Sequence, residues 1–322
     1  MAFRMRRRAA LGMAAALAAG RPALAQQSRP IRLVVPYAAG SGPDLFARQF
    51  AQGLAARLDS AVVVDNRGGA TTIIGAEHVA GSPPDGHTLF MGTSTTFLTN
   101  PFLFRRLPYD LSRFQPISLL IRTRLALYAN AELPANDMAG VVALAKAASS
   151  PLHYGITGRG NSTHLTGEAL QIAAGIRLVD VPYRGTGPMQ QGLIRNDIPL
   201  AIDGIPAWLS LVGERRVRVI AVTGNSRVAA LPQTPTFAEA GLSDLGRQHW
   251  YGLFAPAGLP PALLARLHGA TVATMQDAPF WQKLIDEGAI IETNTPGNFT
   301  AMLAEEKDIW GAIIRRVGIS LD

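Results

Sequence analysis

The chain contains no cysteine at any of its 322 positions. Disulfide bonds and thiol chemistry are therefore excluded, and the fold has to be stabilised by a packed core. Beyond the N-terminal region there is no uninterrupted apolar run of about 18 residues, the length that a membrane-spanning helix needs. Low-complexity tracts and tandem repeats are also missing. We therefore expect a soluble mature chain, long enough for about two ordinary domains.

Excess positive charge is also nearly absent once the first 25 residues are set aside. The whole chain has a formal charge of +7. Five of the positive residues (Arg4, Arg6, Arg7, Arg8 and Arg21) lie in that segment, which has no acid, so the remainder carries +2. A chain so close to neutral gives no reason to expect a nucleic-acid or anionic-membrane partner.

The first 25 residues have the pattern of a signal peptide. A basic start from Arg4 to Arg8 precedes an Ala/Leu-rich stretch over 9–19, and Ala23-Leu24-Ala25 fits a small-x-small cleavage site. We therefore expect cleavage after about Ala25 and a periplasmic location. The run Arg6-Arg7-Arg8 leaves Sec and Tat export both open.

Short apolar strands alternate with amphipathic helices along the rest of the chain. The first set begins with a strand over 31–35 and a helix over 43–58, and a second set begins near Arg124. This rhythm predicts an α/β protein with parallel sheets covered on both faces. After Trp250 the pattern of the first set returns. We expect a first lobe over 26–124, a second over 125–249, and a return to the first over 250–322.

A glycine-rich turn follows the first strand directly. Glycines bare backbone amides, and at a helix N-terminus such amides bind an anion without a lysine or arginine. The third glycine of a dinucleotide fingerprint falls at Leu45, so a nucleotide cofactor is not expected. A purely structural tight turn stays open as an alternative. The residues predicted to bind ligand here are Tyr37, Ala39, Gly40, Ser41, Gly42 and Asp44.

A second glycine-rich turn follows the strand that ends near Thr157. It has the spacing of a phosphate-binding loop, but Asn161 stands where the lysine would be, so ATP hydrolysis is rejected. The predicted donors and contacts are Thr157, Gly158, Asn161, Ser162 and His164, with Thr163 as a further donor. Asp203 ends a strand and is expected either to face the ligand or to cap the following turn.

Catalytic and metal-binding constellations do not assemble in the sequence. Ser94 lacks the closing glycine of a nucleophile elbow, and the six histidines are not paired at metal-ligand spacing. His164 in a first helical turn is more often a structural partner than a base. We therefore expect no catalytic residue, no metal and no cofactor, and keep Ser94 only as a candidate ligand contact.

A set of short motifs in a fixed order resembles the Bug (TctC-like) family, the extracytoplasmic solute receptors of tripartite tricarboxylate transporters. Each motif is weak alone, and the resemblance covers essentially all of the mature chain. The motifs are Pro36 to Asp44, Asp65-Asn66-Arg67, Gly69-Ala70, Ile74-Gly75-Ala76-Glu77, Pro84-Asp85-Gly86, Asn100-Pro101, Leu107-Pro108-Tyr109-Asp110, Gly158 to His164, Gly167-Glu168, Val181-Pro182-Tyr183-Arg184-Gly185, Leu231-Pro232, Pro235-Thr236, Glu239-Ala240-Gly241 and Ala255-Pro256-Ala257-Gly258.

The resemblance implies a type II periplasmic-binding-protein fold, with two α/β lobes that close on a ligand. It implies that the loop Tyr37 to Asp44 holds one carboxylate and that Thr157 to His164 holds the far end, with Asp203 opposite. The chain departs from the family pattern at Ser41, at Thr71-Thr72, which replace a glycine pair, and at Ile156, which replaces a common serine. These departures leave the identity of the acid open.

The expected function is that of a monomeric receptor, not an enzyme, which captures a small organic acid and delivers it to membrane permease subunits. A receptor that presents its ligand to a membrane sensor has the same fold and stays open. A secreted serine hydrolase using Ser94 or Ser162 with His164 is the alternative from another class.

Overall fold

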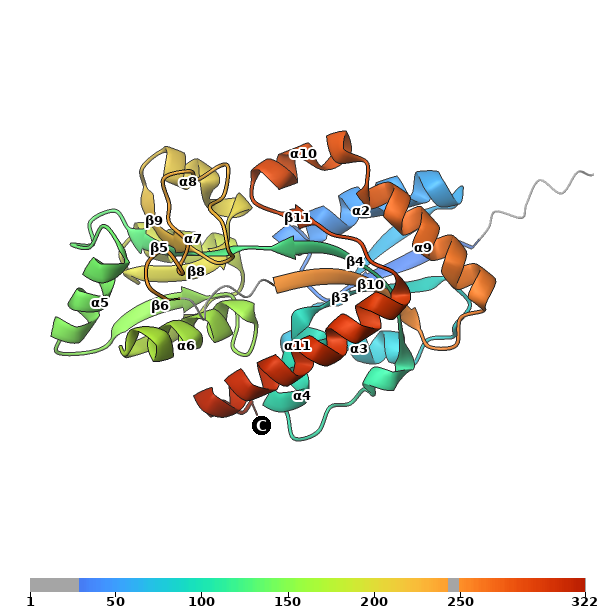
Figure 1. The fold of residues 1–322 in the computed structure, drawn as a ribbon, viewed down its shortest axis with the longest axis horizontal. Coiled ribbons are helices and arrows are strands. Elements are labelled where there is room, and N and C mark those ends of the chain that lie inside the picture. The colour runs from blue at the N-terminus through green and yellow to red at the C-terminus, as the bar shows by residue number, and fades with distance from the viewer. Residues whose placement is uncertain (1–28, 243–248, 322) are drawn as a thin grey trace, which may run out of the picture.

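The computed structural model describes residues 29–242 and 249–321, so the predicted signal peptide and its cleavage site lie outside the described residues. Within these ranges no helix is both long and apolar enough to cross a membrane. The chain forms two lobes side by side, each built on one sheet (Figure 1).

The first lobe holds a six-stranded sheet in the order β11-β4-β10-β3-β1-β2. Its strands are β1 (Ile31–Val35), β2 (Val62–Asn66), β3 (Thr88–Thr93), β4 (Phe114–Thr123), β10 (His249–Pro256) and β11 (Ile290–Ile291). β1 pairs in parallel with β2 and β3, whereas β10 runs antiparallel to β3 and β4. The sheet is therefore mixed, and the expectation of a purely parallel sheet was wrong, because β4 and the returning β10 pair with each other rather than through crossover helices.

Helices cover both faces of this sheet. α2 (Gly42–Leu58), α9 (Pro261–Met275) and α10 (Ala278–Asp286) lie on one face, where Phe46, Phe50 and Trp281 are fully or almost fully buried. α3 (Ile73–Ala80), α4 (Asn100–Leu103) and α11 (Pro296–Val317) lie on the other face, over a core that includes Trp250 and Phe299. Both faces are apolar, as a sheet buried on two sides requires.

The second lobe holds a five-stranded sheet in the order β7-β6-β8-β5-β9. Its strands are β5 (Leu125–Asn130), β6 (Leu152–Ile156), β7 (Leu178–Pro182), β8 (Leu200–Gly204) and β9 (Val217–Val222). β6 is parallel to β7 and β8, and β5 is antiparallel to β8 and β9. α5 (Met138–Ala147) and α6 (Ser162–Ala174) pack on one face, and α7 (Thr186–Ile194) and α8 (Leu209–Gly213) on the other.

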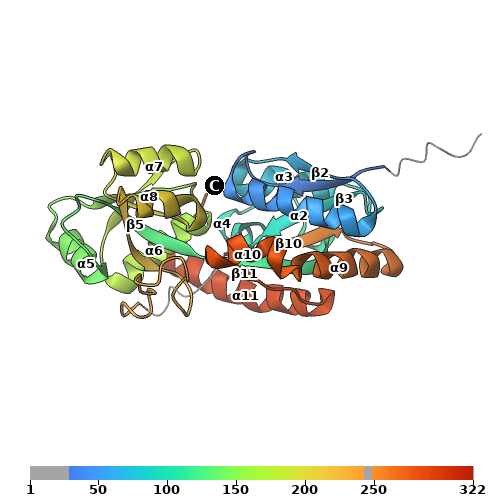
Figure 2. The same cartoon turned by 90° about the horizontal axis from the view of Figure 1, so that it is seen from above.

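The chain crosses between the sheets at Arg124, the single residue between β4 and β5, and again between β9 and β10. Arg124 also holds the loop that follows β9. Its guanidinium donates to the backbone oxygens of Ser226 and Arg227 and, at 2.9 Å, to the hydroxyl of Ser226. Seen from above, α11 runs from the first lobe along the underside toward the second (Figure 2). A loop after β3 also contains one turn of π-helix, η2 (Thr95–Thr99).

Candidate ligand site between the lobes

The predicted site residues follow the carboxyl ends of parallel strands. Tyr37 follows β1, Ser94 follows β3, Thr157 follows β6 and Asp203 lies near the end of β8. In open α/β sheets, ligands bind outside the carboxyl ends of the strands. The two lobes turn these ends toward each other, because the second glycine turn contacts the first lobe.

The first glycine turn is shaped by Asp44. This carboxylate is 1 % exposed, and it accepts the N–H of Gly40 at 2.8 Å, Nε of Arg48 at 2.9 Å and Nδ2 of Asn66 at 2.9 Å. Burial alone would raise the pKa of Asp44, but these donors outweigh it and hold the pKa below its usual range. Gly40 takes φ +78°, a value that a side chain would strain. The hydrogen bonds that Asp44 accepts therefore fix the conformation of the turn.

Several amides of this turn are left without an internal acceptor. The N–H of Gly40 is taken by Asp44 and that of Ser41 points to the oxygen of Ala38 at 3.3 Å. Within the described residues, the N–H groups of Gly42 and Asp44 at the start of α2 bond to no backbone or side-chain oxygen, and the N-cap Ser41 makes no capping bond. Ala39, Gly40 and Gly42 are exposed. The exposed Gly42 thus offers its amide to solvent at a positive helix end, while the unpaired amide of Asp44 belongs to a buried residue.

The second glycine turn is more fully bonded to itself. Asn161 caps α6 by accepting the N–H groups of Thr163 at 3.1 Å and His164 at 3.2 Å, and its own amide donates to the hydroxyl of Thr157 at 3.0 Å. The N–H of Thr157 bonds to the hydroxyl of Thr163 at 3.1 Å. Three of the predicted donors are therefore engaged inside the turn. The amides of Gly158 and Ser162 have no internal acceptor among the described residues.

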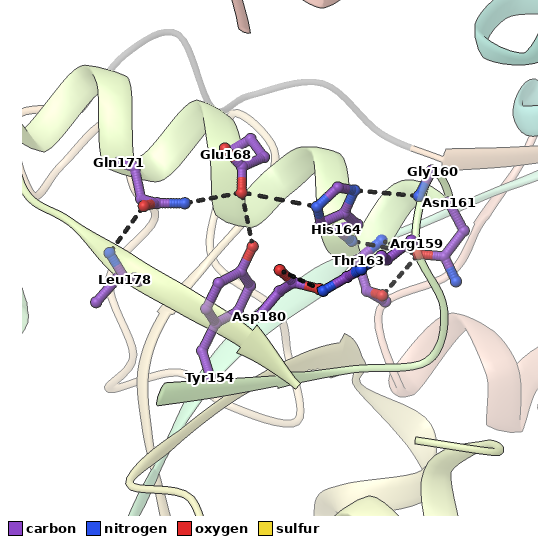
Figure 3. A network of polar contacts seen from close by, with 10 residues as sticks. All are labelled: Tyr154, Arg159, Gly160, Asn161, Thr163, His164, Glu168, Gln171, Leu178 and Asp180. Carbon is purple, nitrogen blue, oxygen red and sulfur yellow. Dashed lines mark hydrogen bonds and ion pairs between the residues drawn. The ribbon is translucent and has the colours of Figure 1, made fainter. Parts of the chain in front are cut away.

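His164 is built into the network that supports this turn (Figure 3). Its Nδ1 accepts the N–H of Gly160 at 3.1 Å, and its Nε2 faces Glu168 at 3.7 Å. Glu168 in turn accepts from the hydroxyl of Tyr154 and the amide of Gln171. Burial lowers the pKa of His164 in spite of the neighbouring Glu168 and Asp180. Nδ1 is thus used within the second lobe, and Nε2 faces a carboxylate of the same lobe.

The second turn also touches the first lobe. The hydroxyl of Thr71 lies 3.5 Å from the oxygen of Arg159, and that of Thr99 lies 3.5 Å from the oxygen of Gly160. A side chain at Gly160 would collide with Leu321 and come within 3.0 Å of Leu103. This turn is therefore part of the contact between the lobes.

Thr71, Thr72 and Ile156, where the chain departs from the family pattern, lie in different parts of the structure. Thr71 and Thr72 take φ of +53° and +73°, so they adopt the glycine-favouring conformation and store strain. Ile156 is fully buried in the apolar core of the second lobe. Its side chain therefore does not line the space between the lobes.

Asp203 is a buried carboxyl at the edge of the second lobe. It accepts the hydroxyl of Thr186 at 2.7 Å and the indole N–H of Trp208 at 3.0 Å. Burial raises the pKa of Asp203, and these two donors oppose the rise. Burial, followed by Tyr37 and then this carboxyl, raises the pKa of Tyr251 in the other lobe. Asp203 thus closes its local turn through Thr186 and Trp208.

Aromatic rings form a row on the first-lobe side. The ring of Tyr37 meets that of Tyr251 edge-on at 6.2 Å between centroids, and Tyr251 meets His249 edge-on at 5.1 Å. Loss of hydration raises the pKa of Tyr37 to about 12, while a hydrogen bond with Thr93 opposes the rise. Ser94 lies in the same place, hydrogen-bonded through its Oγ to Nδ1 of His249. Tyr37 and Ser94 are thus brought together, by way of Tyr251 and His249.

Sequence reasoning did not single out His249 or Tyr251. Their spacing of two in a strand puts both side chains on one face, and this period was a usable signal. The partner of His249 was not readable, because Ser94 is 155 residues away. Groups of three or more acidic or histidine side chains that could hold a metal are absent from the described residues.

The hydrolase alternative finds no support in this geometry. Ser94 bonds to His249 rather than His164, and within the described residues no carboxylate bonds to the His249 ring. A catalytic triad needs an acid to orient the histidine while its other nitrogen faces the serine. Ser162 makes no hydrogen bond to a histidine in the described part of the chain.

Comparison with known proteins gives the same picture over most of the chain. The model of the tripartite tricarboxylate transporter family receptor (TctC) matches residues 46–319. Protein BugT of Bordetella pertussis strain Tohama I is 28 % identical over 296 residues, covering 91 % of each chain.

Solved structures agree in fold. An R. palustris protein, Rpa4515, solved with adipate, is 30 % identical with a TM-score of 0.85, covering 91 % of this chain and 98 % of its own. MatC from Rhodopseudomonas palustris, solved with bound malate, is 27 % identical with a TM-score of 0.81, covering 89 % and 99 %. The expected two-lobed periplasmic-binding-protein fold is confirmed. Because the family match spans most of the chain, this protein belongs to the Bug (TctC) family of tripartite tricarboxylate transporter receptors, and it is a solute-binding receptor rather than an enzyme.

Proposed function

We propose that this receptor captures a small organic carboxylate in the periplasm by closing its lobes, and delivers it to the membrane subunits of a tripartite tricarboxylate-type transporter. The observation that carries the proposal is the exposed first glycine turn with its unpaired amides at Gly42 and Asp44. Relatives solved with adipate and with malate support a carboxylate as the ligand class.

Neutral donors rather than cations are available for the acid. The nearest arginines at the two turns are engaged, Arg48 with Asp44 at 2.9 Å and Arg159 with Asp180 at 2.6 Å. Amides held in place by a folded turn need no reorganisation when an anion arrives, and an N–H bond to a charged group is stronger than a neutral one. The second turn contributes the amides of Gly158 and Ser162 from the opposite lobe.

Closure requires a hinge, and the two crossings between the sheets supply one. Arg124 lies at the first crossing and holds the backbone of Ser226 and Arg227 just beyond the end of β9. We propose that the lobes rotate about Arg124 and its contacts with Ser226 and Arg227. The proposed lobe limits are 26–124 with 250–322 for the first lobe and 125–249 for the second. The export segment over 1–25 would bring the chain to the periplasm.

A thermal-shift screen tests ligand capture directly. The panel contains malate, succinate, adipate, citrate, glutamate and benzoate. An acid present at about 100 times its Kd stabilises the folded protein by roughly 2.7 kcal/mol. A receptor for this class gives a clear rise in Tm with at least one acid, and a flat response to all six contradicts the proposal.

A matched pair of variants tests the first turn. Nothing lies within 4 Å of a Cβ placed on Gly42 or on Gly297, which occupies the start of α11. Gly42→Ala adds a methyl group beside the free amides and should reduce the acid-induced rise in Tm, measured against the variant's own ligand-free Tm. Gly297→Ala alters another helix start far from the site and should keep the full rise. An equal response in both variants would contradict the role of the first turn.

Delivery is tested separately with membrane vesicles that contain the transporter's membrane subunits. The acid identified in the screen should enter only when the receptor is present. Uptake that does not depend on the receptor would overturn the delivery step and leave acid binding intact.

A further inference from the structure

His249 occupies the edge of the first lobe that faces the second. It is the first residue of β10 and pairs with Thr123 of β4. On its other side Tyr251 pairs with Thr93, the last residue of β3, so His249 lies just past the carboxyl end of β3. The candidate site residues gather at this same edge. His249 is 6 % exposed and belongs to none of the predicted contacts.

Ser94 is the hydrogen-bond partner of one ring nitrogen of His249. The Oγ of Ser94 bonds to Nδ1 of His249 and to no other group in the described part of the chain. A serine hydroxyl can donate to an imidazole nitrogen or accept from it; where it donates to Nδ1, the second ring nitrogen of the neutral imidazole carries the hydrogen. We assign His249 the tautomer with N–H at Nε2 from this pattern.

The Nε2 of His249 has no hydrogen-bond partner among the described residues. The side chain is also largely buried. A largely buried ring N–H without a protein partner is available to an oxygen of a ligand. His249 therefore presents one oriented donor at the edge where the lobes meet.

The groups around His249 leave this donor uncharged. Burial alone lowers the pKa of His249 to about 4, with no contribution from a neighbouring charge. Arg122 in β4 is bonded to Glu292 and Glu306. The titratable and charged groups near this edge are, by element, Tyr37 after β1, Arg124 between the sheets, Tyr251 in β10 and Asp203 in β8, whereas Arg122 lies beside Trp250 on the opposite face of the sheet.

We propose that His249 is a specificity-determining contact of this receptor, whose Nε2–H donates to an oxygen of the bound carboxylate while Ser94 fixes the tautomer. The inference rests on the proposed function and adds a contact from β10 to those of the two glycine turns. The edge-on packing of Tyr251 on His249 supports the position of the ring.

Proton uptake is the consequence that a merely structural histidine would not show. An anion beside an imidazole favours its charged form, so carboxylate binding raises the pKa of His249 from its ligand-free value of about 4. Between the two values the complex binds a proton that the free receptor does not. Affinity therefore rises as the pH falls from 8 toward 5, in addition to any effect of the acid's own ionisation.

The experiment is titration calorimetry with the tightest-binding acid of the six-member panel, at pH 8 and 5.5, in two buffers of different ionisation enthalpy. His249→Gln keeps an N–H donor that cannot titrate, so it should bind within about threefold of the unmodified protein at pH 8 and lose the extra proton uptake at pH 5.5. His249→Phe loses the donor and should bind about tenfold or more weakly at both pH values. His153→Gln, at an exposed histidine in β6, is the matched control and should behave as the unmodified protein.

Each outcome bears on the inference. Proton uptake that is unchanged in His249→Gln, or a His249→Phe variant that binds normally, would overturn it while leaving the receptor function intact. Binding of none of the six acids to the unmodified protein would overturn both. Circular dichroism of each variant checks folding, and an NMR titration of the unmodified protein follows the His249 ring even where a variant fails to fold. A His249 pKa that does not move on adding the acid counts against the contact.

Discussion

The carboxylate of Asp44 accepts the backbone N–H of Gly40 at 2.8 Å, so an acid in the first turn of α2 holds the loop that leads into the same helix. The same carboxylate takes the amide of Asn66 from the end of β2. One buried acid thus joins the turn, the helix and the neighbouring strand.

Replacing Asp44 should loosen this turn. Asp44→Ala leaves the N–H of Gly40 and the amide of Asn66 without their acceptor, and we expect a loss of about 2–3 kcal/mol of unfolding free energy. Urea unfolding measures it. Arg48→Ala removes a partner that is half exposed and should cost less than about 1 kcal/mol. Equal losses in the two variants would show that Asp44 does not brace the turn.

His249 should make stability depend on pH in the weakly acidic range. Its pKa is about 4 in the folded chain and about 6.5 when unfolded, so the unfolded state binds more protons between these values. Unfolding free energy is therefore lost as the pH falls from 6.5 to 4, by about 3 kcal/mol from this group, and is unaffected above that range.

Denaturant unfolding of the ligand-free protein at pH 7.5 and pH 4 tests this dependence. The lowered pKa values of Asp44 and His164 act in the same direction, but they are common to the unmodified protein and His249→Gln. The difference between the two therefore isolates His249. Parallel loss of stability in both proteins would contradict the prediction.

Gly160 should tolerate no side chain. It takes φ +78°, and a Cβ there would collide with Leu321. Gly160→Ala is expected to cost about 2–4 kcal/mol, from backbone strain together with overpacking at the contact between the lobes. Gly175→Ala shares a positive φ of 60° but has nothing within 4 Å, so it should cost only about 1–2 kcal/mol. Thermal unfolding that ranks the two alike would argue against this contact.

Thr71 offers a stabilising substitution. Its φ of 53° strains a β-branched residue, and its hydroxyl makes only a long contact with Arg159 at 3.5 Å. Thr71→Gly should raise the unfolding free energy by about 0.5–1 kcal/mol, because relief of strain exceeds the entropic cost of glycine. Thr71→Ala keeps the strain and should give no gain. A Thr71→Gly protein that is less stable than Thr71→Ala would show that the hydroxyl contact outweighs the strain.

Local patterns predicted most individual elements of the fold. The helix expected over 43–58 is observed as Gly42–Leu58, and the strand expected over 31–35 is observed as Ile31–Val35. The strand β4 (Phe114–Thr123) was not foreseen, because its apolar run carries no alternation or flanking glycine. Without β4, the antiparallel half of the first sheet could not be predicted.

Some features of the candidate site could also be predicted from the sequence, and others could not. Glycines, prolines and a first-turn acid mark the two turns, so their place after strands could be read from the sequence. Which amides are free could not be read, since this depends on the direction of the side chains of Asp44 and Asn161. The pairing of Ser94 with His249 depends on two strands that meet only in the folded sheet.

The sequence by itself determined the two α/β sets, the glycine turns after strands and the family, because periodicity, turn residues and ordered motifs are local properties of the chain. The tertiary structure decided the mixed sheets, the hydrogen bonds of Arg124 to Ser226 and Arg227, and the partner of His249. Those features depend on contacts between residues about 100 to 150 positions apart, which only packing brings together.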